Sequence, residues 1–539
     1  MPSMDTDTII IGNGPSAMIL SYILHGHLPY YSSENPHPDP LLHAKLKDAP
    51  ALLGADVDAL TEHFSASRLS YSTQALPVNV LLDTLVRPSV DVEELQSITN
   101  VEWRYEPKKA VPHRVLGNAP CPGGQWTENR MPASWEIQTL SYASMLSLPG
   151  YSFADHHRRT TGKDLPAYTR PSRQETAGYF RSYPKAVAID DAFYSNEDVW
   201  GVTRHEDGFF IRSHNIRCKH LVLASGIFSE VLQPRPLLRP LTFLQPILET
   251  PLLVIGSGFS AADVIISAPG NQKIIHVFKW DPENHPSPLR GCHQHAYPEY
   301  AGVYRLMRRA AAVAQPNNTN RIKPLRTTSS TFLESRPWAD IYEGFPNTEI
   351  IDVQTQDGMA IVTFRRSDGI TFSRPVRGMV YATGRRGTLG YIDQSLLREI
   401  IGSDDNAEVN PTISGQTLRG KAVENVEVAK DVFIIGSLTG DSLIRFAYGS
   451  CVQAAGKLID GFTGSDTPKT SSTPVSRHDL NIGVMRGIDG HDVYNKSGQL
   501  CADQDKPAVA PSRPANDAAK GVWAWLTRIL GWPGLYGTG

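Results

Sequence analysis

The sequence has 539 residues, of which 40% are apolar and 20% charged, as expected for a globular protein of two to four domains. Its 52 basic and 55 acidic residues give a net charge of −3, which excludes a broadly basic nucleic-acid-binding protein and any general attraction to anionic membranes. Five dispersed cysteines without a Cys-x-x-Cys pair exclude a disulfide scaffold, a cysteine zinc site and a vicinal dithiol. Neither a signal peptide nor a bilayer-spanning apolar run is evident, so we expect a cytoplasmic protein.

Residues 8–24 match a dinucleotide-binding fingerprint, a buried strand followed by a Gly-x-Gly-x-x-Ala turn and a helix. The first glycine allows the tight turn, the second lets a pyrophosphate approach the backbone, and the alanine keeps the helix close to the strand. The helix N-terminus then faces the phosphates. The cofactor contacts expected here are Gly12, Gly14, Pro15, Ser16 and Ala17.

An acid that binds the adenosine ribose is expected about twenty residues after such a turn. Glu34 stands at that distance, after an apolar stretch at residues 28–31. Two interpretations stay open: Glu34 binds the ribose, or it is an ordinary solvated carboxylate in a loop.

A second strand, glycine turn and helix are predicted at residues 251–266, followed by a strand at residues 273–278. The cofactor contacts expected here are Gly256, Ser257, Gly258, Ser260 and Ala261. Lys279 follows the later strand, where this fold meets the adenosine ribose. A base at that place suits a 2′-phosphate and hence NADPH rather than NADH, but an exposed lysine at a strand end is an equal alternative.

Two fingerprints in one chain predict two dinucleotides between which electrons pass, and we expect FAD and NADPH. Residues 219–226 and 378–384 each predict a strand that ends in a turn of small residues and glycine, as at the end of a nucleotide-binding domain. Thr383 and Gly384 in the second of these turns are candidate cofactor contacts, and so is Arg386, for which a solvated turn is the alternative.

The predicted fold is α/β, with two Rossmann-like dinucleotide-binding domains and an irregular C-terminal tail. The expected parts are the first part of the FAD domain at residues 1–246, the NADPH domain at 247–384, the second part of the FAD domain at 385–463 and the tail at 464–539.

The return to the FAD domain carries a strand and a glycine turn at residues 431–440. A helix is expected from there to about Ile459, with Asp441 or Ser442 as its N-cap. Its N-terminus would point at the flavin N1–C2=O edge, where negative charge accumulates on reduction. An ordinary capped helix is the structural alternative.

The tail is rich in Pro, Ser and Thr and ends in a Trp-rich helix at about residues 520–532, which is too short to span a bilayer. We favour docking of this helix on the same protein or on a second subunit of a homo-oligomer. A partner protein or a membrane interface is the alternative.

Five motifs resemble the oxidative stress-induced growth inhibitor family, in family order, across about residues 8–460. These motifs lie at residues 9–16, 36–42, 122–126, 297–300 and 440–446. That family is similar in turn to class B flavoprotein monooxygenases, in which a Gly-Gly-x-Trp segment lies against the flavin. By this resemblance Gln125 and Trp126 form a flavin wall, although plain core packing is the alternative for Trp126.

The resemblance implies an FAD- and NADPH-dependent monooxygenase in which reduced flavin and O₂ give a C4a-(hydro)peroxyflavin that oxygenates a small organic substrate. The Phe-x-Gly-x-x-x-His-x-x-x-Trp signature of Baeyer–Villiger enzymes is missing between the two fingerprints, which disfavours ester formation. Residues 437–443 resemble a turn of microbial N-hydroxylases, so N-hydroxylation of an amine or indole nitrogen in a natural product of secondary metabolism is the preferred interpretation.

Two other functions stay open: an NADPH-dependent flavin reductase or oxidase without oxygen transfer, and a nucleotide-binding regulatory protein with little turnover. No catalytic side chain and no metal site are predicted, because the histidines at positions 113, 156, 157, 293 and 295 lack a metal-ligand context. The loop at residues 282–300, rich in Pro and aromatic residues, is a candidate lid.

Overall fold

The computed structural model describes residues 4–67, 69, 71–88, 99–128, 131–244, 250–314, 331–402 and 408–463. The predicted tail with its Trp-rich helix lies outside these ranges. Of the helices described, none combines the length and the apolar character needed to cross a bilayer.

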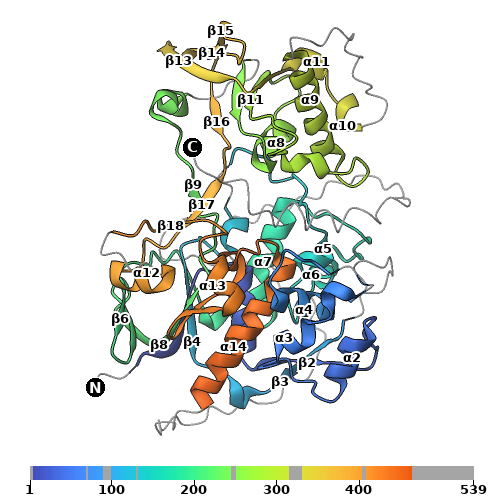
Figure 1. The fold of residues 1–539 in the computed structure, drawn as a ribbon, viewed down its shortest axis with the longest axis vertical. Helices are drawn as coiled ribbons and strands as arrows, with labels where there is room; N and C mark the ends of the chain where they lie inside the picture. The colour runs from blue at the N-terminus through green and yellow to red at the C-terminus, as the bar shows by residue number, and fades with distance from the viewer. Residues whose placement is uncertain are drawn as a thin grey trace. The chain divides into compact units, whose positions relative to one another are not determined.

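The larger sheet has eight strands, with the order β19-β20-β8-β1-β4-β5, while β7 pairs with β8 and β6 with β7 (Figure 1). Its strands are β1 (Thr6–Ile11), β4 (His113–Gly117), β5 (Phe193–Ser195), β6 (Val202–His205), β7 (Gly208–Ile211), β8 (Ile216–Leu223), β19 (Glu427–Ala429) and β20 (Val432–Ile434). The run from β20 to β5 is parallel, with β1 at its centre. Ile9 and Ile10 are fully buried because a central parallel strand is covered on both faces.

Helices cover this sheet, and α14 packs against both α1 and α4 (Figure 1). The helices of this part are α1 (Pro15–Leu24), α2 (Pro40–Lys47), α3 (Val57–Thr61), α4 (Pro77–Val86), α5 (Ala143–Leu146), α6 (Phe153–Thr161), α7 (Arg173–Ala186), α12 (Gln394–Ile401), α13 (Arg419–Glu424) and α14 (Tyr448–Thr463). Local sequence sets several of their starts. Capping boxes at Ser152 and Ser172 begin α6 and α7, for example.

A second parallel sheet has the order β12-β11-β10-β16, and an antiparallel sheet β13-β14-β15 is inserted in the chain between β12 and β16. The strands are β10 (Leu252–Ile255), β11 (Ile274–Phe278), β12 (Tyr342–Pro346), β13 (Glu349–Gln356), β14 (Met359–Arg365), β15 (Thr371–Val376) and β16 (Met379–Tyr381). The accompanying helices are α8 (Phe259–Ser267), α9 (Pro298–Ala314), α10 (Thr331–Glu334) and α11 (Trp338–Ile341). The predicted α/β class with parallel sheets is confirmed, while the predicted domain boundaries stay a prediction.

The two segments through which the chain passes between these regions pair with each other as short strands. β9 (Glu230–Val231) pairs with β17 (Arg385–Thr388), which also pairs with β18 (Thr412–Ile413). Hydrogen bonds therefore join the segment that follows β8 to the segment that follows β16.

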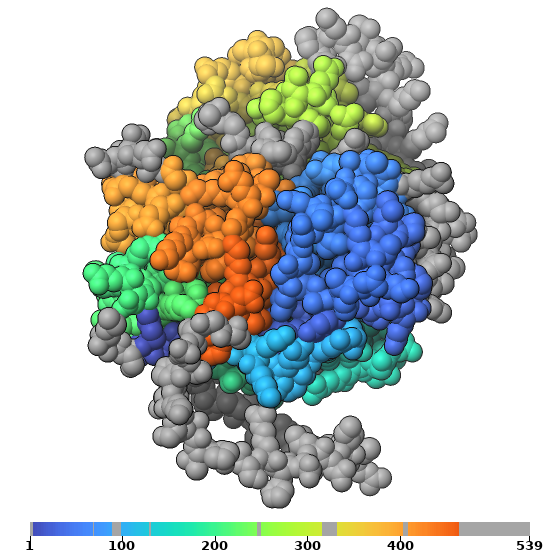
Figure 2. Space-filling model, turned by 60° about the horizontal axis from the view of Figure 1, so that its bottom comes forward, coloured from blue at the N-terminus to red at the C-terminus, as the bar shows by residue number. Residues whose placement is uncertain are grey.

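An insertion at residues 25–112 separates α1 from β4. It contains α2 to α4 and a two-stranded antiparallel sheet of β2 (His27–Tyr31) and β3 (Val101–Tyr105). In Figure 2 its blue surface lies beside the orange and red surface of the last described segment. The apolar stretch at residues 28–31 thus forms a strand, but this strand does not join the larger sheet.

The helix expected to begin at Asp441 or Ser442 begins instead at Tyr448. Two short 3-10 turns, at Gly436–Thr439 and Ile444–Phe446, occupy the intervening chain. The N-cap prediction for Asp441 and Ser442 was therefore wrong.

Candidate dinucleotide-binding site

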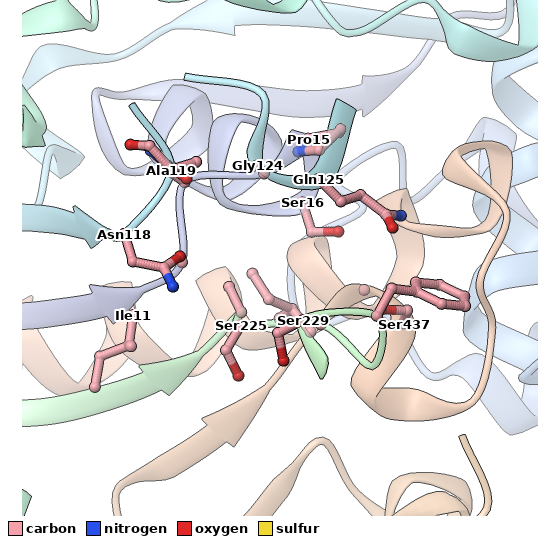
Figure 3. A pocket seen from close by; sticks show the side chains of 18 of the residues that line it. Ile11, Pro15, Ser16, Asn118, Ala119, Gly124, Gln125, Ser225, Ser229 and Ser437 are labelled. Carbon is pink, nitrogen blue, oxygen red and sulfur yellow. The ribbon is translucent and has the colours of Figure 1, made fainter. Parts of the chain in front are cut away.

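A hollow lies where β1 ends, with about 1340 Å³ of empty space when the open solvent at its mouth is included. The expected cofactor contacts that line it are Gly12, Gly14, Pro15, Ser16, Gln125, Trp126, Asp441 and Ser442. Figure 3 shows Ser16, Gln125 and Ser437 around this space. Three sequence segments more than a hundred residues apart thus meet at one hollow.

The first glycine turn has the geometry that its motif requires. Gly12 has a φ of +114°, and a Cβ there would lie 2.3 Å from the Ala224 carbonyl oxygen, so only glycine fits. Gly14 has an ordinary φ of −80°, and a Cβ there would meet nothing within 4 Å. Gly14 is also the N-cap of α1, which has no side-chain cap, so the first N–H groups of the helix are available to an anion. Ala17 is fully buried beneath the turn.

The Gly-Gly-x-Trp segment forms a 3-10 turn, Gly124–Trp126, directly beside the first glycine turn. Gly123 N–H donates to the Asn13 carbonyl at 2.9 Å, and a Cβ at Gly124 would lie 3.1 Å from the Gly14 Cα. Trp126 lines the hollow and also packs against the main core, so core packing is confirmed for this side chain and the flavin wall stays a prediction.

Asp441 lines the hollow, but its carboxylate is engaged by protein donors. Oδ2 accepts from the Leu76 N–H at 2.8 Å and from Asn79 Nδ2 at 2.7 Å, and Oδ1 accepts from Arg419 Nη1 at 2.6 Å. The side chain is only 4% exposed. Asp441 therefore anchors the beginning of α4, a role that local sequence does not reveal because Leu76 lies 365 residues away.

The turn Gly436–Thr439 touches the first glycine turn. Gly436 has a φ of +63°, and a Cβ there would lie 2.1 Å from Ser16 Oγ. Ser437 Oγ accepts from the Ile227 N–H at 3.3 Å, which joins this turn to the segment after β8. Ser442 lines the same wall of the hollow.

Glu34 is exposed and does not line the hollow, so the structure does not bring the candidate ribose acid to the first glycine turn. The chain supplies other polar residues there, at the ends of β4, β5 and β8 and after β17. These are Asn118, Glu197, Asp198, Ser225, Ser229 and Tyr391. Only the pairing of strands could have identified them, since β4 is the parallel neighbour of β1.

The second glycine turn repeats the geometry of the first. Gly256 has a φ of +145°, with a Cβ position 2.2 Å from the Ala382 carbonyl oxygen. Gly258 is the N-cap of α8, which has no side-chain cap. Ser257 and Ser260 are half-buried near the start of α8, whereas Ala261 is buried.

His276 supports this second turn from β11. Its Nε2 donates to the Gly256 carbonyl at 2.6 Å, and its Nδ1 accepts from Tyr342 Oη at 2.8 Å, which assigns the neutral tautomer. Burial lowers the pKa of His276 to about 4.

The remaining predicted cofactor contacts are Lys279, Thr383, Gly384 and Arg386. Lys279 is exposed and follows β11 directly, which is the position expected to meet an adenosine ribose. Thr383 and Gly384 follow β16, and Arg386 lies in β17 opposite Glu230. None of these four predicted contacts lines the hollow at β1.

The candidate lid packs on the second glycine turn. Ser287 Oγ donates to the Ser257 carbonyl at 2.6 Å. At the other end of the loop, Arg170 donates to Glu299 at 2.6 Å and lies 4.5 Å from the ring centroid of Tyr297. The Tyr-Pro-Glu-Tyr motif therefore fixes the start of α9 to the chain between α6 and α7.

Asp263 on α8 is a buried carboxyl near the second turn. It accepts from Tyr300 Oη at 2.8 Å. Burial raises the pKa of Asp263 to about 6, against the opposing effects of that hydrogen bond and of Arg173 and Arg385. The last residue of the Tyr-Pro-Glu-Tyr motif thus has a specific polar partner.

No protein-family model matches the chain. It is 26% identical to oxidative stress-induced growth inhibitor 1 of Mus musculus over 496 residues, which cover 84% of this chain and 94% of that protein. It is also 26% identical to oxidative stress-induced growth inhibitor 2 of Homo sapiens, over 84% of this chain and 92% of that protein. The resemblance to the oxidative stress-induced growth inhibitor family is confirmed. A Caenorhabditis elegans homologue in this family is 30% identical over 41% of this chain and 48% of that protein.

Solved structures match the chain at low identity and with TM-scores below 0.5. The bacillithiol disulfide reductase Bdr of Staphylococcus aureus is 11% identical, with a TM-score of 0.48 over 85% of this chain and 99% of that chain. The flavin-containing monooxygenase of Stenotrophomonas maltophilia is 12% identical, with a TM-score of 0.45 over 86% and 100% of the two chains. The cadaverine monooxygenase DfoA of Erwinia amylovora, solved with FAD, is 13% identical, with a TM-score of 0.46 over 87% and 100%.

Proposed function

We propose that this protein is an FAD- and NADPH-dependent monooxygenase that oxygenates a small organic substrate. The hollow at the carboxyl end of β1 carries the proposal. The first glycine turn, the Gly-Gly-x-Trp segment and the turn Gly436–Thr439 all line it. In open parallel sheets, nucleotides bind at this end of the strands.

The residues of the hollow fit an FAD molecule. The uncapped N-terminus of α1 offers N–H groups and a positive dipole end to a pyrophosphate, and Gly14 places no side chain in its way. Gln125 and Trp126 would form a wall against the flavin and exclude water from it. Bound flavin would supply hydride acceptance from a nicotinamide and reaction with O₂.

The second glycine turn would bind NADPH. The N-terminus of α8 is uncapped like that of α1, and Gly258 likewise leaves the approach to the backbone open, with its nearest Cβ contact at 4.0 Å. Lys279 stands where the strand next to β10 ends, and an exposed ammonium group there suits a 2′-phosphate.

The cysteines of the described ranges disfavour a dithiol reductase with the same folds. Cys121, Cys218, Cys292 and Cys451 are all buried. Burial raises the pKa of the Cys218 and Cys292 thiols to about 12, so neither supplies a thiolate near neutral pH.

For the substrate, we propose an amine or indole nitrogen of a natural product. Support comes from the likeness of residues 437–443 to an N-hydroxylase turn and from the missing Baeyer–Villiger signature. Residues 437–443 form part of the wall of the hollow, so their side chains would affect the environment of a bound flavin.

Anaerobic and aerobic spectroscopy of the purified holoprotein tests the proposal. We expect a yellow protein whose flavin is bleached by NADPH without oxygen and reoxidised on adding oxygen, with a product 16 mass units heavier from a panel of amines and indoles. Bound flavin that NADPH does not reduce would support the regulatory alternative. Reoxidation with hydrogen peroxide and no oxygenated product would support the oxidase alternative.

Three glycine-to-alanine variants separate the two cofactor sites. Gly14→Ala places a methyl group in open space at the first turn, so we expect a folded protein that loses FAD. Gly258→Ala places a methyl group at the matching position of the second turn, so we expect bound FAD that NADPH reduces slowly. Gly420→Ala in α13, where a Cβ also meets nothing within 4 Å, is the matched control and should change neither property.

A further inference from the structure

The end of β4 takes the place that the sequence assigned to Glu34. β4 is the parallel neighbour of β1, with Ile11 opposite Leu116, whereas β2 pairs with β3 in a separate two-stranded sheet. In a nucleotide-binding sheet, the strand beside the glycine strand carries the group that binds the ribose at its carboxyl end. The relevant positions are therefore those that follow Leu116, after the insertion, and not those that follow β2.

An acid cannot stand at the last residue of β4. Gly117 occupies that position, and a Cβ there would lie 2.2 Å from the Asn13 Cγ. The Asn13 side chain fills the space and donates through Nδ2 to the Ala119 and Cys121 carbonyls at 3.3 Å. Asn13 thus holds the loop after β4, and recognition of a ribose must come from other side chains.

Two polar residues at adjacent strand ends line the hollow there. Asn118 is exposed to the hollow, and Figure 3 shows its amide projecting into it. Glu197 follows β5, and its N–H donates to the Gly117 carbonyl at 3.0 Å, which fixes it beside Asn118. His214 Nε2 lies 2.9 Å from Glu197 Oε2 and orients the carboxylate.

We propose that Asn118 and Glu197 together bind the adenosine ribose hydroxyls of the dinucleotide in this hollow. An amide both donates to and accepts from a hydroxyl group, and a carboxylate accepts from one, so the pair replaces the single acid of the usual arrangement. The inference rests on the proposed FAD site and adds to it the residues that recognise the adenosine half.

Binding of FAD and FMN to the apoprotein, measured by quenching of flavin fluorescence, tests the pair. FMN lacks the adenosine half, so it controls for damage to the rest of the hollow. Loss of a hydrogen bond to a charged group is worth roughly 10- to 100-fold in affinity, and loss of a bond between neutral groups roughly 2- to 10-fold. We therefore expect Glu197→Gln to weaken FAD binding by about tenfold or more and Asn118→Ala by roughly 2- to 10-fold, with FMN binding unchanged. Glu34→Gln, on the exposed loop, should bind FAD like the unaltered protein.

The outcomes separate this inference from the proposed function. Failure of the unaltered apoprotein to bind FAD overturns the proposed function. Unchanged FAD affinity in both variants, in a protein that does bind FAD, overturns the ribose assignment alone. So does weakening of FAD by Glu34→Gln, or equal weakening of FAD and FMN by Asn118→Ala.

Discussion

Replacement of Asp441 by alanine should destabilise the protein before any cofactor is bound. The carboxylate accepts from the Leu76 N–H, from Asn79 Nδ2 and from Arg419 Nη1, at 2.6 to 2.8 Å. It is buried, so alanine leaves the backbone and amide donors at the start of α4 without their acceptor.

The expected loss is about 3–5 kcal/mol, as for a buried ion pair that loses one partner. The part of this loss that comes from Arg419 is small. Its guanidinium still donates to the Thr439 carbonyl at 3.0 Å and to the Gln74 carbonyl at 2.6 Å, and it is 20% exposed. Most of the loss therefore falls on Leu76 and Asn79. A local opening energy lower by about 3 kcal/mol corresponds to roughly 100-fold faster amide exchange.

Hydrogen exchange of the apoprotein, read by mass spectrometry on peptides that cover α4, measures this effect without assuming that so long a chain unfolds in one step. Ser442→Ala is the matched control, because Ser442 lines the same hollow but is not part of this hydrogen-bond network. Unchanged exchange at Leu76 in Asp441→Ala, together with weakened FAD binding, would refute the structural role and restore the sequence prediction that Asp441 serves the flavin directly.

Three further changes are expected to have separable effects. His276 is buried with its pKa lowered to about 4, against about 6.5 in an unfolded chain, so its contribution is complete above pH 6.5 and is lost as the pH falls toward 4. This amounts to about 3 kcal/mol, and His276→Gln should flatten the fall of the thermal midpoint between pH 6.5 and 4. Gly256→Ala should lower the thermal midpoint even without ligand, because its Cβ would meet the Ala382 carbonyl at 2.2 Å; an unchanged midpoint would contradict the turn geometry. Lys279→Ala should raise the KM for NADPH about tenfold and leave that for NADH unchanged, and equal effects on both would exclude recognition of the 2′-phosphate.

Local patterns were sufficient for the two glycine turns. A buried strand, Gly-x-Gly and an apolar helix lie within about seventeen residues, and the steric demands of Gly12 and Gly256 act over the same short range. The contacts that set them, at Ala224 and Ala382, come from the strand ends that the sequence predicted from its small-residue turns. The α/β class could therefore be predicted from residues close together in the chain.

The ribose position could not be predicted in that way, because it depends on which strand lies next to β1. Counting twenty residues assumes that the next strand is the neighbour, and the insertion at residues 25–112 breaks that assumption. Nothing in residues 28–31 distinguishes a strand that joins the larger sheet from one that pairs with β3. The exposed position of Glu34 follows directly from that pairing.

The same insertion also explains why the chain after the turn Gly436–Thr439 does not begin a helix that Asp441 caps. α4, which it supplies, carries the fully buried Asn79. Asn79 Nδ2 donates to Asp441, and Asn79 Oδ1 accepts from the Ser450 N–H at 2.8 Å, near the start of α14. A Cβ at Gly449 would lie 2.2 Å from the Val78 carbonyl oxygen, so α14 can approach α4 this closely only with glycine there. One asparagine from the insertion thus caps the helix that Asp441 was expected to cap, and Asp441 stabilises the helix that carries that asparagine. Each partner is more than 350 residues from the other, so only the folded chain reveals that the insertion supports Asp441, which lines the hollow.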